Sequence, residues 1–151
     1  MITIKEFKKK HPNKVRFVGL DLGSKRIGVS ICDEQQSIAT PFKTINKTNT
    51  NDLIEDLKII IQENNIEGII IGNPINMDGS IGRSAQSVND VATNISKSIN
   101  LPVILWDERL STVGAFNLSS QLDVNVSKRV KTIDQNAAAF ILQGAIDYLN
   151  N

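Results

Sequence analysis

The stretch VRFVGLDLGSKRIGVSIC, residues 15–32, decides how this sequence folds. An apolar run reaches Asp21, the chain turns at residues 23–26, and a second apolar run follows. Two such runs so close together predict an antiparallel hairpin, and the first is apolar enough to be a central strand. A carboxylate that ends a buried strand is costly unless something pairs with it or binds it. Asp21 is therefore a candidate metal ligand, a member of a phosphate-binding turn, or the cap of its own turn.

The composition is that of an ordered, globular chain. Its 151 residues are one domain's length, with 40% hydrophobic and 22% charged side chains. A net charge of +1 argues against binding of nucleic acid by bulk charge, although it leaves room for a local basic patch. Cys32 is the only cysteine, which excludes an intrachain disulfide and predicts a small buried side chain.

Neither a secretory signal nor a membrane span is evident. The start, MITIKEFKKKHP, is charged where a signal needs an apolar region, and no apolar stretch approaches the ~20 residues of a membrane helix. We therefore expect a cytoplasmic protein with no membrane partner. Thr3 and Glu6 have capping-box spacing, so residues 1–14 are expected to form a short helical N-terminal extension. Residues 15–151 are expected to form a single domain.

The rest of the pattern predicts an α/β fold. A third strand is expected at 37–45, where Pro41 favours a sheet edge. Further strands are expected at 67–72 and 101–108, helices from residue 50, from residue 84, over 111–122 and from residue 132, and a basic loop over 125–131. Because strands alternate with helices after residue 47, we expect parallel strands, a mixed sheet, and helices on both faces.

Three acidic residues fall where a site could form. Asp21 ends the first strand, Glu108 ends the last one beside Asp107, and Asp134 is expected in the first turn of the final helix. Active crevices in open α/β sheets lie at the carboxyl ends of parallel strands, so Asp21 and Glu108 should share one side of the sheet. Converging carboxylates repel unless a cation neutralises them, and Mg²⁺ prefers oxygen ligands. The pattern thus favours Mg²⁺ or Mn²⁺ and phosphodiester hydrolysis.

Each acid also has a purely structural interpretation. Asp21 can cap its turn, and Asp134 can complement a helix dipole. Asp107 and Glu108 can form surface ion pairs, and strand alternation points one of these two away from the site. The single histidine, His11, lies in the N-terminal extension, which argues against histidine-based nucleases and zinc sites.

Four collinear blocks, GLDLGSKRIGVSIC, GNPINMDGS, LWDERLSTV and IDQNAAAFILQGAIDYL, resemble the YqgF family of RuvC-like nucleases over nearly the whole chain. The resemblance implies an RNase H-like fold with a five-stranded mixed sheet. It also implies that Asp21, Glu108 and Asp134 are catalytic residues and divalent-metal ligands. The implied substrate is precursor 16S ribosomal RNA, processed at its 5′ end, with the four-way DNA (Holliday) junction as the alternative. Asn73 and Gly114 depart from the family pattern, which usually has leucine and an acid there.

Basic side chains flank each acid in the sequence and would form a rim around a converged site. They would bind phosphates with strong salt dependence and little sequence readout. The six candidates for nucleic-acid binding are Lys25, Arg26, Arg109, Lys128, Arg129 and Lys131. The backbone of NMDGSIGRS offers either a further phosphate contact or only an ordered crossover loop.

Two other classes of protein share part of this pattern. ATPases of the actin and sugar-kinase type have a similar DLGS turn, but they bind nucleotide between two domains, for which 151 residues are too few. A non-catalytic nucleic-acid-binding module is the other alternative, and the presence of all three acids argues against it. The sequence leaves the assembly open between a monomer and a weak homodimer.

Overall fold

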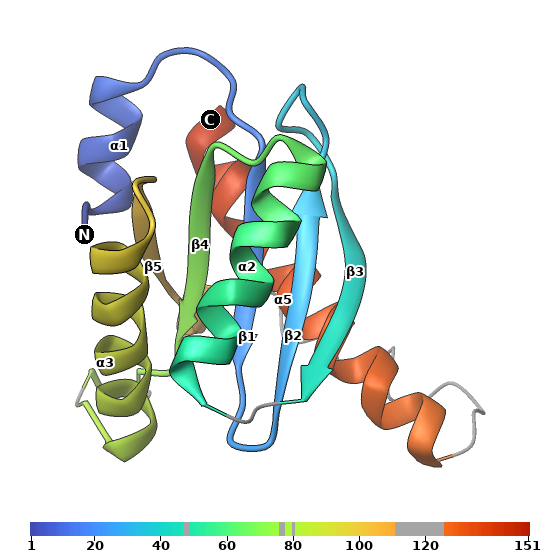
Figure 1. Cartoon of the computed structure of the whole chain (residues 1–151). Coiled ribbons are helices and arrows are strands. Elements are labelled where there is room, and N and C mark those ends of the chain that lie inside the picture. The colour runs from blue at the N-terminus through green and yellow to red at the C-terminus, as the bar shows by residue number, and fades with distance from the viewer. Residues whose placement is uncertain (47–48, 76–77, 80, 111–125) are drawn as a thin grey trace.

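The computed structural model describes residues 1–46, 49–75, 78–79, 81–110 and 126–151, with only the helical backbone for 126–135. The predicted helix over 111–122, with Gly114, lies outside this part. The described elements, shown in Figure 1, are α1 (Ile4–Lys10), β1 (Phe17–Leu22), β2 (Arg26–Cys32), β3 (Ala39–Asn46), α2 (Thr50–Asn64), β4 (Gly68–Asn73), α3 (Arg83–Ser98), β5 (Val103–Asp107), the 3₁₀ turn η1 (Glu108–Leu110) and α5 (Val126–Asn150).

The five strands form one mixed sheet in the order β3-β2-β1-β4-β5. The hairpin of residues 15–32 pairs β1 antiparallel with β2, which in turn pairs antiparallel with β3. β4 pairs parallel with both β1 and β5. This topology confirms the central position predicted for the first strand and the edge position predicted for the strand that contains Pro41. It also brings the carboxyl ends of β1, β4 and β5 to the same end of the sheet (Figure 1).

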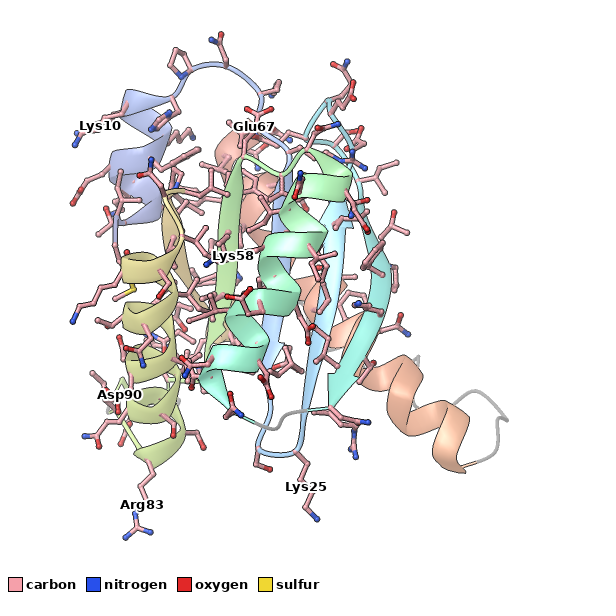
Figure 2. The ribbon with its side chains drawn as sticks, viewed as in Figure 1. Lys10, Lys25, Lys58, Glu67, Arg83 and Asp90 are labelled. Carbon is pink, nitrogen blue, oxygen red and sulfur yellow. The ribbon has the colours of Figure 1, made fainter. Side chains whose placement is uncertain are left out.

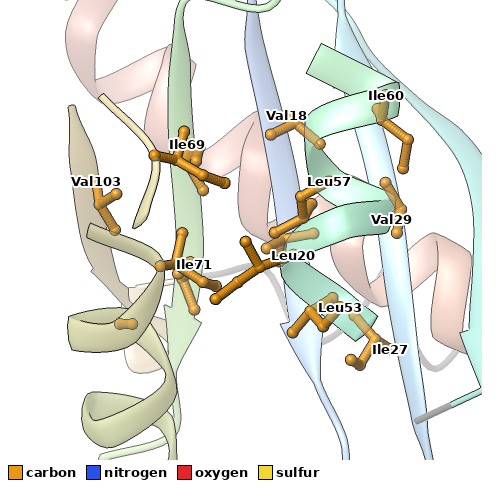
Figure 3. Packing of buried hydrophobic residues seen from close by; sticks show 14 of the residues in the cluster. Val18, Leu20, Ile27, Val29, Leu53, Leu57, Ile60, Ile69, Ile71 and Val103 are labelled. Carbon is orange, nitrogen blue, oxygen red and sulfur yellow. The ribbon is translucent and has the colours of Figure 1, made fainter. Parts of the chain in front are cut away.

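Helices cover both faces of the sheet, as predicted. α2 and α3 cover one face over an aliphatic core (Figure 3), which includes Val18, Leu20, Leu57, Ile69, Ile71 and Ile95. α5 covers the other face, over a second core that includes Phe17, Ile70, Ile104, Trp106, Ile141 and Leu142. Successive residues of a strand point to opposite faces. Odd-numbered residues of β1 and even-numbered residues of β4 and β5 therefore point toward α5.

The N-terminal residues pack onto the α5 side of the sheet. Thr3 caps α1 as predicted, because its Oγ1 accepts a hydrogen bond from the Glu6 backbone N–H at 3.1 Å. Phe7 is buried and contacts the ring of Phe17. Cys32 is buried as predicted, its Sγ accepts from the Phe17 N–H at 3.1 Å, and burial raises the pKa of the thiol. Among the described helices, none is both long and apolar enough to cross a membrane.

The last helix begins earlier than the sequence predicted. Residues 125–131 were expected to be a loop and Asp134 to lie in the first helical turn, but α5 begins at Val126. The segment VSKRVK contains neither glycine nor proline, and lysine and arginine are good helix formers, so nothing interrupts the helix there. Asp134 consequently lies well inside α5 and not in its first turn.

Candidate active site

The candidate site lies where three parallel strands end. Asp21 is the next-to-last residue of β1, and Glu108 follows directly after β5. β4 lies between these two strands, with Leu20 paired to Ile71 and Trp106 paired to Gly72. Asp21 and Gly72 therefore lie side by side on neighbouring strands, and both point toward α5. The geometry confirms the expectation that Asp21 and Glu108 share one side of the sheet.

Glu108 extends from the end of β5 over β4. A methyl group added to Gly72 would lie 3.2 Å from the carboxyl carbon of Glu108 and 2.5 Å from Cδ1 of Ile141. The carboxyl group thus borders the space that a side chain at position 72 would fill. The sequence alone does not distinguish Gly72, because the run EGIIIG indicates only a short apolar strand. Its role becomes visible only when the strand order is known.

The Glu108 carboxyl has a strongly perturbed environment. Burial is the largest cause that raises its pKa, and the negative charges of Asp21 and Asp107 raise it further, from 4.5 to about 7. The influence of Asp21 shows that the two acids lie close enough to repel each other. Such a group binds a proton near neutral pH, or a cation in place of that proton.

Asp107 and Arg109 form an ion pair of their own. The Arg109 guanidinium donates to Asp107 Oδ2 from Nη2 at 2.6 Å and from Nε at 3.0 Å. The Arg109 backbone N–H donates to Asp107 Oδ1 at 3.0 Å. The hydrogen bonds from Arg109 lower the pKa of Asp107 and, reciprocally, raise that of the guanidinium. The two acids of the DER block therefore point to different surroundings, as strand alternation predicted. Asp107 is paired with Arg109, and Glu108 lies beside Asp21. Arg109, a candidate phosphate contact, is engaged in this pair.

Asp134 is positioned through α5. The Oγ of the buried Ser30 donates to the Ala138 carbonyl at 2.8 Å, which fixes the middle of the helix against β2. Farther along, Asn150 accepts from the Gln36 side chain at 2.9 Å, and Gln36 accepts from the Val15 N–H at 3.0 Å. α5 therefore runs back along β1, and Asp134 lies one turn before Ala138. Its side chain, like those of Lys128, Arg129 and Lys131, is outside the described part.

The remaining basic candidates lie at the same end of the sheet. Lys25 is exposed in the turn between β1 and β2, and Arg26 is partly buried at the start of β2. Figure 2 shows Arg83, a further cation that was not among the sequence-based candidates, at the same end of the molecule as Lys25 but on α3. Between the turn and α3 is a hollow of about 200 Å³, whose polar lining comes from Ser24, Arg83, Ser84 and Ser87. The only sequence signal for Arg83 was its place at the end of a glycine-rich loop.

Asn73 stands where the family usually has leucine, and this difference has a cost in stability. Within the described residues, its Oδ1 is a buried side-chain oxygen that accepts no hydrogen bond. An unsatisfied buried oxygen is destabilising, and a leucine at this strand end would avoid that cost. The residue follows Gly72 and pairs in register with Asp107, so it lies beside the site but on the opposite face of the sheet.

The chemistry of the acids fits a hard divalent cation. No group of three His, Cys, Asp or Glu side chains that could hold a metal is found in the described part of the chain. Asp21 and Glu108 nevertheless provide two carboxylates on one face, and Mg²⁺ typically takes only one or two carboxylates with water and substrate phosphates as its other ligands. A cation between the two acids would remove the repulsion that raises the pKa of Glu108.

Comparisons with known sequences point to one family. Residues 15–148 match the family model RuvX, described as Holliday junction resolvase. A protein of Pelagibacter ubique (strain HTCC1062), named "Putative pre-16S rRNA nuclease", is 87% identical over 151 residues, which are 100% of both chains. A Rhodobacter capsulatus protein with the same name is 44% identical over 138 residues, covering 91% of this chain and 87% of its own length.

Solved structures show the same fold. The Thermus thermophilus RuvC structure superimposes with a TM-score of 0.55 at 8% identity, covering 88% of this chain and 95% of RuvC. RuvC from the same organism in complex with a Holliday junction substrate gives a TM-score of 0.53 at 10% identity, covering 89% and 94% of the two chains. At such low identity the likeness concerns the fold alone. It confirms the predicted RNase H-like architecture.

Proposed function

Because the chain belongs to the RuvX family, also called YqgF, we propose that it is a divalent-metal-dependent nuclease that acts in 5′-end maturation of precursor 16S ribosomal RNA. The substrate comes from the names of its relatives. The observation that carries the metal dependence is the placement of Glu108, whose pKa is raised to about 7 by burial and by Asp21. Without a cation, this arrangement of two acids only costs stability.

Asp21, Glu108 and Asp134 are the proposed metal ligands and catalytic residues. Bound Mg²⁺ or Mn²⁺ would supply the positive charge that neutralises charge developing on the scissile phosphate. The protein's part is to hold the carboxylates on one face and to place the phosphate among them. With a pKa of about 7, Glu108 is partly protonated at neutral pH, and any proton bound there must leave as the cation binds.

The proposed contacts with nucleic acid come from the basic side chains around the acids. Lys25 and Arg26 lie in the turn and strand that follow Asp21. Lys128, Arg129 and Lys131 belong to the first two turns of α5. Arg109 is proposed to act mainly through its bonds to Asp107, which fix the chain where it leaves β5. Backbone contacts of this kind would position a strand without reading its sequence.

Resolution of four-way DNA junctions is the second candidate function. The description of the matching family model favours it. Cutting two strands of a junction symmetrically requires two active sites, so this reaction would need a homodimer, whereas RNA trimming can be performed by a monomer. The assembly is therefore part of the test.

The decisive experiment is a cleavage assay with Mg²⁺, with Mn²⁺ and with EDTA on two substrates. One is end-labelled RNA that carries a ribosomal 5′ leader, and the other is a four-way DNA junction. Asp21→Asn should reduce cleavage by more than about a hundredfold, beyond the range typical of changes around a metal site. It should also retain or tighten RNA binding, because it removes negative charge. Asp90→Asn, at an exposed position on α3 (Figure 2), is the matched control and should cleave normally.

Metal-dependent RNA cleavage that needs Asp21 would support the processing nuclease. Paired cuts confined to the junction would instead support the resolvase. If the protein binds RNA but cleaves neither substrate, and Asp21→Asn binds RNA as the wild type does, both nuclease functions would be contradicted. A non-catalytic nucleic-acid-binding module would then be favoured.

A further inference from the structure

We propose that Gly72 is a positioning residue of the active site: the space left by its missing side chain lets the Glu108 carboxyl lie across β4 beside Asp21. The inference rests on the proposed function, because it explains how one of the proposed metal ligands is positioned. It assigns a role to a residue that carries no chemistry of its own.

The order of strands makes such a space necessary. Asp21 belongs to β1 and Glu108 follows β5, with β4 between them. Neighbouring strands are about 4.8 Å apart, so the two acids start from backbones separated by roughly 10 Å. Glu108 approaches Asp21 only by extending over the residue of β4 that points toward α5. That residue is Gly72, which pairs in register with Trp106, two positions before Glu108.

The contacts around Gly72 are close enough for the smallest side chain to matter. The Cβ of an alanine would lie 3.2 Å from the Glu108 carboxyl carbon, a distance at which the neighbour must shift by a few tenths of an ångström. It would also lie 2.5 Å from Cδ1 of Ile141, which must move. Metal sites are sensitive to small displacements of their ligands. The added methyl group would therefore act on the acid directly as well as on the packing of α5.

Close packing against α5 is the competing explanation for this glycine, and the same strand contains a control for it. Gly68 lies at the other end of β4 on the same face, and an alanine Cβ there would meet the Phe17 ring at 2.5 Å. Gly68→Ala therefore causes a comparable steric conflict on the same face of the same strand, at a distance from the acids. If Gly72 served only packing, the two substitutions would have the same kind of effect.

A second control separates the two neighbours of Gly72. Ile141→Val removes the Cδ1 atom that an alanine at position 72 would meet first, at 2.5 Å. It keeps Cγ1, at 3.1 Å, and leaves Glu108 unchanged. The double variant Gly72→Ala/Ile141→Val should recover much of the stability lost by Gly72→Ala alone. It should not recover the position of the carboxyl. It also provides a folded protein in case Gly72→Ala alone does not fold.

The experiment measures Mn²⁺ affinity of the protein without nucleic acid, from the electron paramagnetic resonance signal of free Mn²⁺. Thermal unfolding in EDTA is measured in parallel. We expect Gly72→Ala and the double variant to raise the Mn²⁺ dissociation constant by about tenfold or more, the scale of changes around metal ligands. Gly68→Ala should lower the unfolding temperature while its Mn²⁺ affinity stays at the wild-type value.

Two results would overturn the inference while the proposed function stands. One is wild-type Mn²⁺ affinity in Gly72→Ala; the other is full recovery of affinity in the double variant, which would assign the effect to Ile141. Failure of the proposed function would give a different pattern of Mn²⁺ affinities. In that case the wild-type protein itself would bind no Mn²⁺ at this site, and Glu108→Gln would bind as much as the wild type.

Discussion

Glu108 lies close enough to Asp21 for the charge of one to raise the pKa of the other, although β4 separates the strands from which they come. The fold holds these acids together at a cost in stability. In the metal-free protein, burial and the negative charges of Asp21 and Asp107 oppose ionisation of Glu108. A site of this kind is useful only when a cation or a proton is bound there.

Replacing Glu108 by glutamine should stabilise the metal-free protein above neutral pH. The pKa of Glu108 is about 7 in the folded protein, against an ordinary value of 4.5, so the folded state binds the extra proton between these values. The contribution of this group to the stability of the wild type is therefore fully present below pH 4.5 and is lost as the pH rises through about 7. Glu108→Gln escapes this loss. The full shift corresponds to about 3 kcal/mol, and because the carboxyl is partly exposed to solvent we expect the variant to exceed the wild type by roughly 2 kcal/mol at pH 8 and to match it near pH 4.5.

Urea denaturation in EDTA at the two pH values measures this difference. Glu63→Gln, at an exposed position on α2, is the control and should shift stability equally at both. A Glu108→Gln variant that is less stable than the wild type at pH 8 would show that the carboxylate is already neutralised by another group.

Binding of the divalent metal should depend on pH through the same group. Below about pH 7 a proton occupies Glu108, and the cation must displace it. The Mn²⁺ affinity of the wild type should then fall by up to about tenfold per pH unit below 7. Calorimetric titrations at pH 6 and pH 8 test this, with Glu108→Gln expected to bind weakly at both. Equal affinity of the wild type at the two pH values would mean that Glu108 is not a ligand.

The sequence predicted the framework of this site because local patterns determine it. The second apolar run was predicted to be a strand, as β2 (Arg26–Cys32) is, since a turn rich in polar residues separates two apolar runs. The parallel arrangement of β1, β4 and β5 followed from the alternation of strands and helices. That arrangement was sufficient to predict that Asp21 and Glu108 share one side of the sheet.

What the sequence did not predict depends on contacts between distant residues. The role of Gly72 requires the order β1-β4-β5 and the register that places Trp106 beside it. The start of α5 was placed too late because a cluster of basic residues was interpreted as a loop, although lysine and arginine are good helix formers. Asp134 was therefore expected in the first helical turn, whereas it lies well inside α5.

Shortening Glu108 should separate the effect of length from the effect of charge. Glu108→Asp keeps the carboxylate but withdraws it by one methylene, about 1.5 Å, from the space over Gly72. A misplacement of about 1 Å can reduce the rate roughly a hundredfold. We expect cleavage to fall by that order and the Mn²⁺ needed for half-maximal rate to rise. Glu67→Asp, at an exposed position (Figure 2), is the matched control, and an equally active Glu108→Asp would contradict the prediction.

Lys25 should contribute to RNA binding without affecting sequence preference. Its side chain is exposed in the turn after β1, at the end of the sheet where the acids lie (Figure 2). If it contacts one phosphate, Lys25→Ala should reduce the slope of log affinity against log salt by about 0.7 for single-stranded RNA, equally for different sequences. Lys58→Ala is the control, because Lys58 lies on α2 and pairs with Glu55 at 3.5 Å. Filter binding at several salt concentrations measures both slopes. The same slope in the two variants would place the RNA away from the β1–β2 turn.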